Sequence, residues 1–309
     1  MTEAFAHRKL DPSTLVLLVL PPLFWAGNAV VGRMMVGSLA PLELSFWRWC
    51  VALLAALPFT GAALWRARAQ LWRQRGALAR MGLLGIACYN SLQYVALHTT
   101  TPLNVALISS AGPVFIVLIG ALCYRERVGV DALVGAALSA VGVIVVVTQG
   151  QLMHLAQLRL AVGDFVMLLA VLLWGFYTWE LRRHPLGLPP LVGLSAQMAV
   201  GTVIIAPFAL WARYALGEVS HWAPPGVAAV LYVALAASLL AYVCWGEAVA
   251  RTGAQIPVYF ANLLPVFVAL LSFVFLHEGI RTYHVAGAAL IFGGIHVALR
   301  GRARVGGRR

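Results

Sequence analysis

The chain has 309 residues, of which 62% are hydrophobic and 10% are charged, and its mean hydropathy is +0.88. A soluble domain carries about a quarter charged residues, so this composition excludes an ordinary soluble protein and favours a membrane protein. The formal net charge of +12 would suggest a nucleic-acid partner in a soluble protein. Here the arginines cluster between apolar runs, which is typical of membrane orientation, and we expect no nucleic-acid binding.

Ten apolar runs follow one another along the chain. A helix needs about 20 predominantly apolar residues to span the hydrocarbon core, where backbone groups cannot be left unpaired. Most connections are short, and none is long enough for a soluble domain, so we predict an all-α integral membrane protein. The ten predicted transmembrane helices cover residues 14–36, 42–61, 80–98, 102–123, 128–148, 162–183, 190–212, 226–248, 254–276 and 281–299.

The second half of the sequence repeats the first. The Pro-Val-Phe of residues 113–115 returns at 265–267, and the Gly-Ala-Ala-Leu of residues 135–138 returns at 287–290. Ten residues of this region are identical at an offset of 152 residues, and the first helices match at an offset of 149. The chain is therefore a tandem duplication of a five-helix unit. The two repeats are predicted to cover residues 14–148 and 162–299.

Basic residues lie mostly on one side of the predicted topology. With a cytoplasmic N-terminus, seventeen of the 22 basic residues fall on the cytoplasmic side and four fall outside. The positive-inside rule therefore predicts that both termini are cytoplasmic. Since five helices per repeat is an odd number, the second repeat must enter the membrane from the opposite side. Inverted repeats of this kind are a recurrent construction of alternating-access transporters.

Prolines and small residues recur at matching places in the two repeats. Pro113 and Pro265 fall within the fourth and ninth predicted helices, where each removes a hydrogen bond and favours a bend. The matched pair favours a bend that the mechanism uses, and a kink that only helps packing is the alternative. Gly142 and Gly294, with other small residues at helical spacing, favour close packing of two helices in lipid.

Polar and aromatic residues within the spans are candidates for a binding site, because polar groups in lipid are costly. Several recur on matching faces of the two repeats, as Trp25 does with Trp174. Aromatic faces with a few amides suit a small amphipathic molecule. The alternative is that these residues anchor helices at the membrane interface or join helices together. The predicted substrate-binding residues are Trp25, Asn28, Asn90, Gln93, Asn104, Trp174, Tyr177, Tyr242, Trp245, Tyr259 and Asn262.

Other chemistry is not indicated by the sequence. No carboxylate falls at a clear midplane position, so proton coupling is not predicted. Arg48, in the second span, is expected to reach the periplasmic surface or to pair with Glu43. Nucleotide-binding, zinc-protease and nucleophile-elbow motifs are absent, and the cysteines and histidines lack ligand spacing. We therefore predict no catalytic residue, no cofactor and no metal.

Taken together, these motifs resemble the EamA-type members of the drug/metabolite transporter superfamily. The resemblance rests on ten spans in two five-helix units, on Pro-Val-Phe followed by Glu126 or Glu278, and on the Gly-Ala-Ala-Leu-x-x-x-Gly of the fifth and tenth helices. It implies a bacterial inner-membrane exporter of small metabolites, often amino acids. It also implies a central cavity lined by helices one, three, four, six, eight and nine. The helix-two arginine of the family corresponds to Arg48, and its counterpart in the second repeat is Gln197.

The sequence thus predicts a secondary transporter that exports small amphipathic metabolites, amino acids or related compounds, by alternating access. We expect it to work as a single chain in the lipid bilayer of the inner membrane, with a small-molecule metabolite as its partner. Two other classes stay open. A membrane-embedded enzyme would need a convergent nucleophile and base, and a non-transporting scaffold or sensor would not need matched aromatics.

Overall fold

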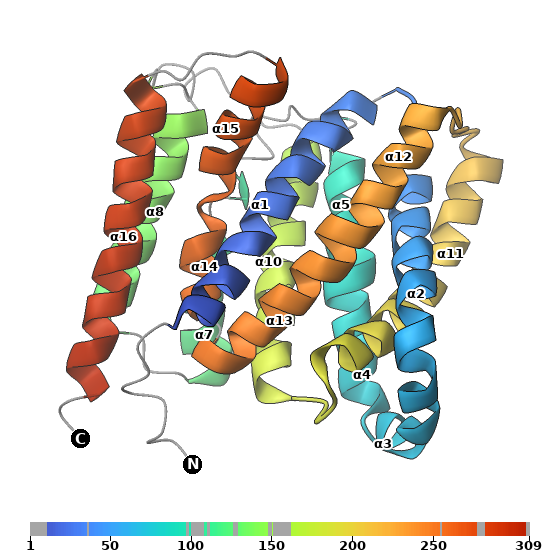
Figure 1. Cartoon of the computed structure of the whole chain (residues 1–309), viewed down its shortest axis with the longest axis horizontal. Coiled ribbons are helices and arrows are strands. Elements are labelled where there is room, and N and C mark those ends of the chain that lie inside the picture. Colours follow the sequence, from blue (N-terminus) through green and yellow to red (C-terminus); the bar gives the residue numbers. More distant parts are fainter. Residues whose placement is uncertain are drawn as a thin grey trace.

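The protein is built from helices over the residues that the computed structural model describes, and no strand occurs among them (Figure 1). The described residues are 11–35, 37–96, 99, 108–109, 112–125, 129–147, 150, 162–253, 255–276 and 282–306. Each of the ten predicted spans falls on a helix or, where part of it is outside these residues, contains one. The all-α prediction is therefore confirmed.

The first repeat contains seven described helices and one π-helical segment. They are α1 (Pro12–Met35), α2 (Pro41–Arg66), α3 (Arg68–Arg73), α4 (Arg75–Met81), the π-helix η1 (Gly82–Cys88), α5 (Tyr89–Ala96), α7 (Gly112–Tyr124) and α8 (Val130–Val147). The second repeat contains α10 (Val162–Arg183), α11 (Pro190–Ala215), α12 (Pro224–Tyr232), the π-helix η2 (Val233–Leu240), α13 (Ala241–Thr252), α14 (Gln255–Ala261), α15 (Leu264–Leu276) and α16 (Thr282–Gly306). Helices α4, η1 and α5 run on continuously, and so do α12, η2 and α13, so that each set forms one long rod.

Five helical segments of the described chain are long and apolar enough to cross a membrane by length and composition. They are Pro12–Gly32, Pro41–Arg66, Val162–Arg183, Pro190–Ala215 and Pro224–Thr252. Three shorter apolar helices, Val130–Gly142, Tyr259–Leu271 and Val285–Gly294, lie where further spans were predicted. The protein is therefore a multi-pass membrane protein, and the count of ten spans stays a prediction.

Two segments differ from the sequence-based expectation. The region 62–79, which connects the second and third predicted spans, is helical: α2 continues to Arg66, and α3 and α4 follow with only single-residue turns between them. Alanine, leucine, arginine and glutamine are strong helix formers, and this stretch consists largely of them. The ninth predicted helix is interrupted by a turn at residues 262–263. Pro265 causes this interruption because it lacks an N–H and its ring clashes with the preceding turn.

Matching helices of the two repeats pack reciprocally. Helix α1 packs on α13 and α10 packs on α5, while α2 packs on η2 and α11 packs on η1. Equivalent residues also meet directly: Asn90 Nδ2 lies 3.0 Å from Tyr242 Oη, and the Trp25 and Trp174 rings lie 5.5 Å apart. A contact between equivalent residues is what a two-fold relation produces on its axis. The repeats therefore meet around an approximate two-fold axis through the middle of the bundle.

Helices α8 and α16 form a close pair at one edge of the bundle (Figure 1). A Cβ atom added to Gly294 would lie 2.6 Å from the Gly135 carbonyl oxygen, and one added to Gly142 would lie 2.8 Å from the Gly287 carbonyl oxygen. Only glycine permits this distance between backbones. The predicted packing role of these glycines is confirmed.

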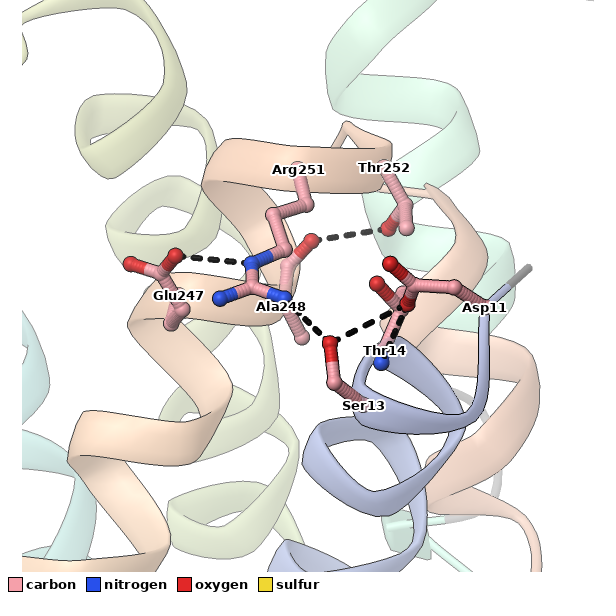
Figure 2. A network of polar contacts seen from close by, with 7 residues as sticks. All are labelled: Asp11, Ser13, Thr14, Glu247, Ala248, Arg251 and Thr252. Carbon is pink, nitrogen blue, oxygen red and sulfur yellow. Dashed lines mark hydrogen bonds and ion pairs between the residues drawn. The ribbon is translucent and has the colours of Figure 1, made fainter. Parts of the chain in front are cut away.

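A polar cluster joins the first turn of α1 to the last turn of α13 (Figure 2). Asp11 caps α1, since its carboxylate accepts hydrogen bonds from the Thr14 backbone N–H at 2.7 Å and from Ser13 Oγ at 3.2 Å. Hydrogen bonding by Thr14 lowers the pKa of Asp11 below its ordinary value. Arg251 then donates to Ser13 Oγ at 2.9 Å and to Glu247 at 2.7 Å. The cluster therefore links the two repeats at one end of the bundle.

Candidate functional site

Five of the predicted binding residues form an aromatic cluster where the repeats meet. The aromatic cluster comprises Trp25 of α1, Trp174 and Tyr177 of α10, and Tyr242 and Trp245 of α13. Between ring centroids, Trp174 lies 5.5 Å from Trp25, 5.6 Å from Tyr242, 5.5 Å from Trp245 and 5.1 Å from Tyr177. The edge-on and tilted arrangements of these rings are favourable, because the electron-rich face of one aromatic ring attracts the positively polarised edge of another. The structure thus brings together residues that are up to 220 positions apart in the sequence, since Trp25 and Trp245 are 5.4 Å apart.

Two further rings, not singled out from the sequence, extend this cluster. Trp49 of α2 lies 5.0 Å from Tyr242, and Tyr89 of α5 lies 4.9 Å from Trp174, centroid to centroid. Trp49 is fully buried. Trp49 directly follows Arg48 in the sequence and Tyr89 directly precedes Asn90, and this adjacency to polar residues could have indicated both rings.

A hydrogen-bond network lies against the aromatic cluster and is centred on Arg48. The guanidinium donates from Nε to Ser238 Oγ at 2.7 Å, and from Nη1 to Asn90 Oδ1 at 2.9 Å and to Tyr94 Oη at 2.8 Å. Asn90 Nδ2 donates in turn to Tyr242 Oη at 3.0 Å, which joins the network to the aromatic rings. Asn90 therefore lies beside the aromatic cluster.

The expectation for Arg48 itself was wrong. The residue is 1% exposed and lies inside the bundle, not at a surface. Glu43 pairs with Arg213 of α11 instead, at 2.7 Å. Five residues of an α-helix correspond to about 140° of rotation, so Glu43 and Arg48 point to different faces of α2.

The π-helices supply backbone acceptors to the same region. Tyr242 Oη donates to the Gly85 carbonyl of η1 at 3.0 Å, and Trp25 Nε1 donates to the Ala237 carbonyl of η2 at 3.1 Å. Gly85 and Ala237 are equivalent at the offset of 152 residues. Each repeat therefore binds a ring of the other through the same backbone position. Short π-helical segments occur frequently at functional sites.

The remaining predicted residues are not all in this region. Tyr259 of α14 packs in a separate apolar cluster and donates from Oη to the Ala132 carbonyl at 2.6 Å. Asn262 is buried in the turn that follows α14. Asn28 and Gln93 are half-buried on α1 and α5, and the Asn28 side-chain oxygen has no hydrogen-bond partner among the described residues. Asn104 lies outside the described residues.

Three carboxylates near span ends, Glu43, Glu180 and Glu247, are held in ion pairs. Glu180 of α10 pairs with Arg80 at 3.1 Å and with His184 at 3.1 Å, and Glu247 pairs with Arg251 at 2.7 Å. Glu126 and Glu278 lie outside the described residues. Within the described part of the chain, no group of three histidine, cysteine, aspartate or glutamate residues is arranged to hold a metal ion.

Comparison with known proteins agrees with this architecture. A protein of known crystal structure shares the fold with a TM-score of 0.76 at 20% identity, covering 95% of this chain and 98% of that chain. An uncharacterized transporter of Archaeoglobus fulgidus is 28% identical over 93% of this chain and 98% of its own length. A probable terminal-alkyne amino-acid exporter of Streptantibioticus cattleyicolor is 28% identical over 94% of each chain.

The two halves of the chain match one family separately. The EamA-like transporter family matches residues 12–148 and again residues 161–300. The two matches lie one after the other along the chain, and each covers one copy of the duplicated sequence. The two matches together span nearly the whole described bundle, and the chain belongs to the EamA-like transporter family.

Proposed function

We propose that this membrane transporter exports small amphipathic metabolites, amino acids or related compounds, across the inner membrane by alternating access. The observation that carries the proposal is the aromatic cluster with its polar network at the meeting of the two repeats. Similarity to a probable terminal-alkyne amino-acid exporter supports the substrate class. The proposed binding residues are Trp25, Asn28, Asn90, Gln93, Trp174, Tyr177, Tyr242 and Trp245.

The packing of the rings supports a mechanism with more than one state. The rings of the aromatic cluster contact one another, so a bound molecule must part them. Because the rings come from α1, α10 and α13, parting them moves helices of one repeat against helices of the other. Movement of one repeat relative to the other around a shared site is the basis of alternating access.

Transport by the purified full-length chain in proteoliposomes tests this function. Vesicles loaded with candidate amino acids and aromatic acids are expected to release at least one compound faster than protein-free vesicles. Because Glu180 and Glu247 are held in ion pairs near helix ends, collapse of a pH gradient should change that rate only modestly. Uncoupled transport would be contradicted if an imposed proton gradient drove accumulation of the substrate and if Glu180→Gln or Glu247→Gln abolished that accumulation. Release of no compound would favour a scaffold or sensor.

Cysteine labelling tests the inverted arrangement of the repeats. In a background without Cys50, Cys88, Cys123 and Cys244, Arg73→Cys should react from the cytoplasm and Val219→Cys from the periplasm. Both positions are exposed, and they lie in matching connections of the two repeats. Reaction of both from the same side would overturn the inverted topology. Cysteines placed at 302–309 and at 151–158 are likewise expected to react from the cytoplasm and from the periplasm, respectively.

A further inference from the structure

Arg48 is a buried cation that has no counter-ion among the described residues. Its hydrogen-bond acceptors, Ser238, Asn90 and Tyr94, are all neutral. No carboxylate of the described chain pairs with it. An isolated charge in a protein interior is costly unless it is paired. Arg48 therefore retains its charge with only hydrogen bonds and the faces of Trp49 and Tyr94, 5.0 Å and 6.0 Å from the guanidinium carbon.

The same region holds further donors that lack acceptors. The Trp49 and Trp245 indole N–H groups are buried and have no hydrogen-bond acceptor among the described residues. The hydrogen bonds of Arg48 come from its Nε and Nη1 groups. Most buried polar groups in proteins are paired, so the unpaired indole N–H groups of Trp49 and Trp245, in and beside the aromatic cluster, need an explanation. A buried guanidinium with neutral hydrogen-bond partners is complementary to an anion.

We propose that Arg48 binds a carboxylate of the transported molecule, whose apolar body lies against the aromatic cluster. The inference rests on the proposed transport function and specifies its substrates as amphipathic monocarboxylates. The position equivalent to Arg48 in the second repeat is Gln197, which is neutral. A single guanidinium with neutral neighbours matches a singly charged group, whereas a phosphate dianion would need a second cation. The carboxylate end of the substrate is thereby directed toward α2 and α5.

Binding of two matched probes tests the proposal. The probes are 3-phenylpropanoate and 3-phenylpropanamide, which differ only in the charged group, and their affinities for the purified full-length protein are measured by calorimetry. Wild type is expected to bind the carboxylate about 10- to 150-fold more tightly than the amide, as for a buried charge-assisted hydrogen bond. Arg48→Gln should lose this preference by weakening carboxylate binding, with amide affinity changed less than about threefold.

Control variants separate binding from folding. Arg213→Gln removes an arginine that pairs with Glu43, and it should keep the preference for the carboxylate. If Arg48→Gln does not fold, Arg48→Lys retains the charge without the forked geometry and should reduce the preference partially. The inference is overturned if the wild-type protein binds neither probe or binds both with equal affinity. It is also overturned if Arg48→Gln still binds the carboxylate more tightly than the amide.

The outcomes also separate this inference from the proposed function. Transport of carboxylates that Arg48→Gln leaves unchanged would support an exporter whose carboxylate site does not include Arg48. Carboxylate binding that depends on Arg48, in a protein that transports nothing, would support the site and refute transport.

Discussion

Replacing Trp174 with alanine is expected to lower transport per folded molecule by about five- to 150-fold. Trp174 contacts four other rings of the aromatic cluster, so its loss removes the surface against which an apolar substrate body would pack. Removing a large aromatic contact costs about 1–3 kcal/mol of binding, which gives this range. The measurement is initial transport rate in proteoliposomes, divided by the amount of folded protein.

Trp179→Ala is the matched control for this variant. Trp179 is buried on the same helix, but it packs on Tyr124 and donates from Nε1 to the Ile116 carbonyl at 2.8 Å. Both substitutions leave a large cavity and should lower stability similarly, by about 3–5 kcal/mol. Only Trp174→Ala should reduce transport beyond the loss of folded protein. Equal transport losses in the two variants would mean that the aromatic cluster is packing and that the binding site lies elsewhere.

Gly294→Ala is expected to destabilise the protein by about 1–3 kcal/mol, and Gly294→Leu is expected to prevent stable folding. The added Cβ atom meets backbone atoms of α8, which cannot turn aside as a side chain can, so α8 and α16 must separate. Their separation forfeits the close packing that holds helices together in lipid. Thermal unfolding in detergent and the yield of monodisperse protein are the measurements.

Gly61→Ala provides the control, since a Cβ atom added to Gly61 of α2 meets nothing within 4 Å. That variant should be as stable as wild type or slightly more stable, because alanine favours helix formation by about 1 kcal/mol over glycine. If Gly294→Ala were as stable as Gly61→Ala, the closeness of α8 and α16 would not contribute to the fold.

The helical architecture was predictable because lipid leaves the backbone few choices. Apolar runs of sufficient length must be helices, and the duplication indicated which helices correspond. The helices α3 and α4 were missed because hydrophobic length detects spans, and this stretch is too polar to be one. The exposed rings of Trp65, at the end of α2, and of Trp72, in α3, lie 4.7 Å and 5.1 Å from the guanidinium carbons of Arg68 and Arg75. Local helix propensity predicts such a segment better than hydropathy does.

The candidate site was predictable only where the repeat itself carried the information. Trp25 and Trp174 were found because they are equivalent and lie on corresponding faces. The position of Arg48 was predicted wrongly because its hydrogen-bond partners lie on other helices, and sequence periodicity does not show how those helices cross α2. One partner, Ser238, is 190 positions away in the sequence. Tyr259 has the residue type of the cluster, but α14 directs it toward Ala132 of α8.

The π-helical segments determine the direction of the side chains that follow them. Asn90 lies two residues beyond η1 and Tyr242 lies two residues beyond η2. A π turn accommodates one additional residue, and one residue of an α-helix corresponds to about 100° of rotation about its axis. In uninterrupted α-helices, both side chains would point about 100° away from their observed directions. The hydrogen bond between Asn90 and Tyr242, and that between Asn90 and Arg48, therefore depend on an irregularity carried by both repeats.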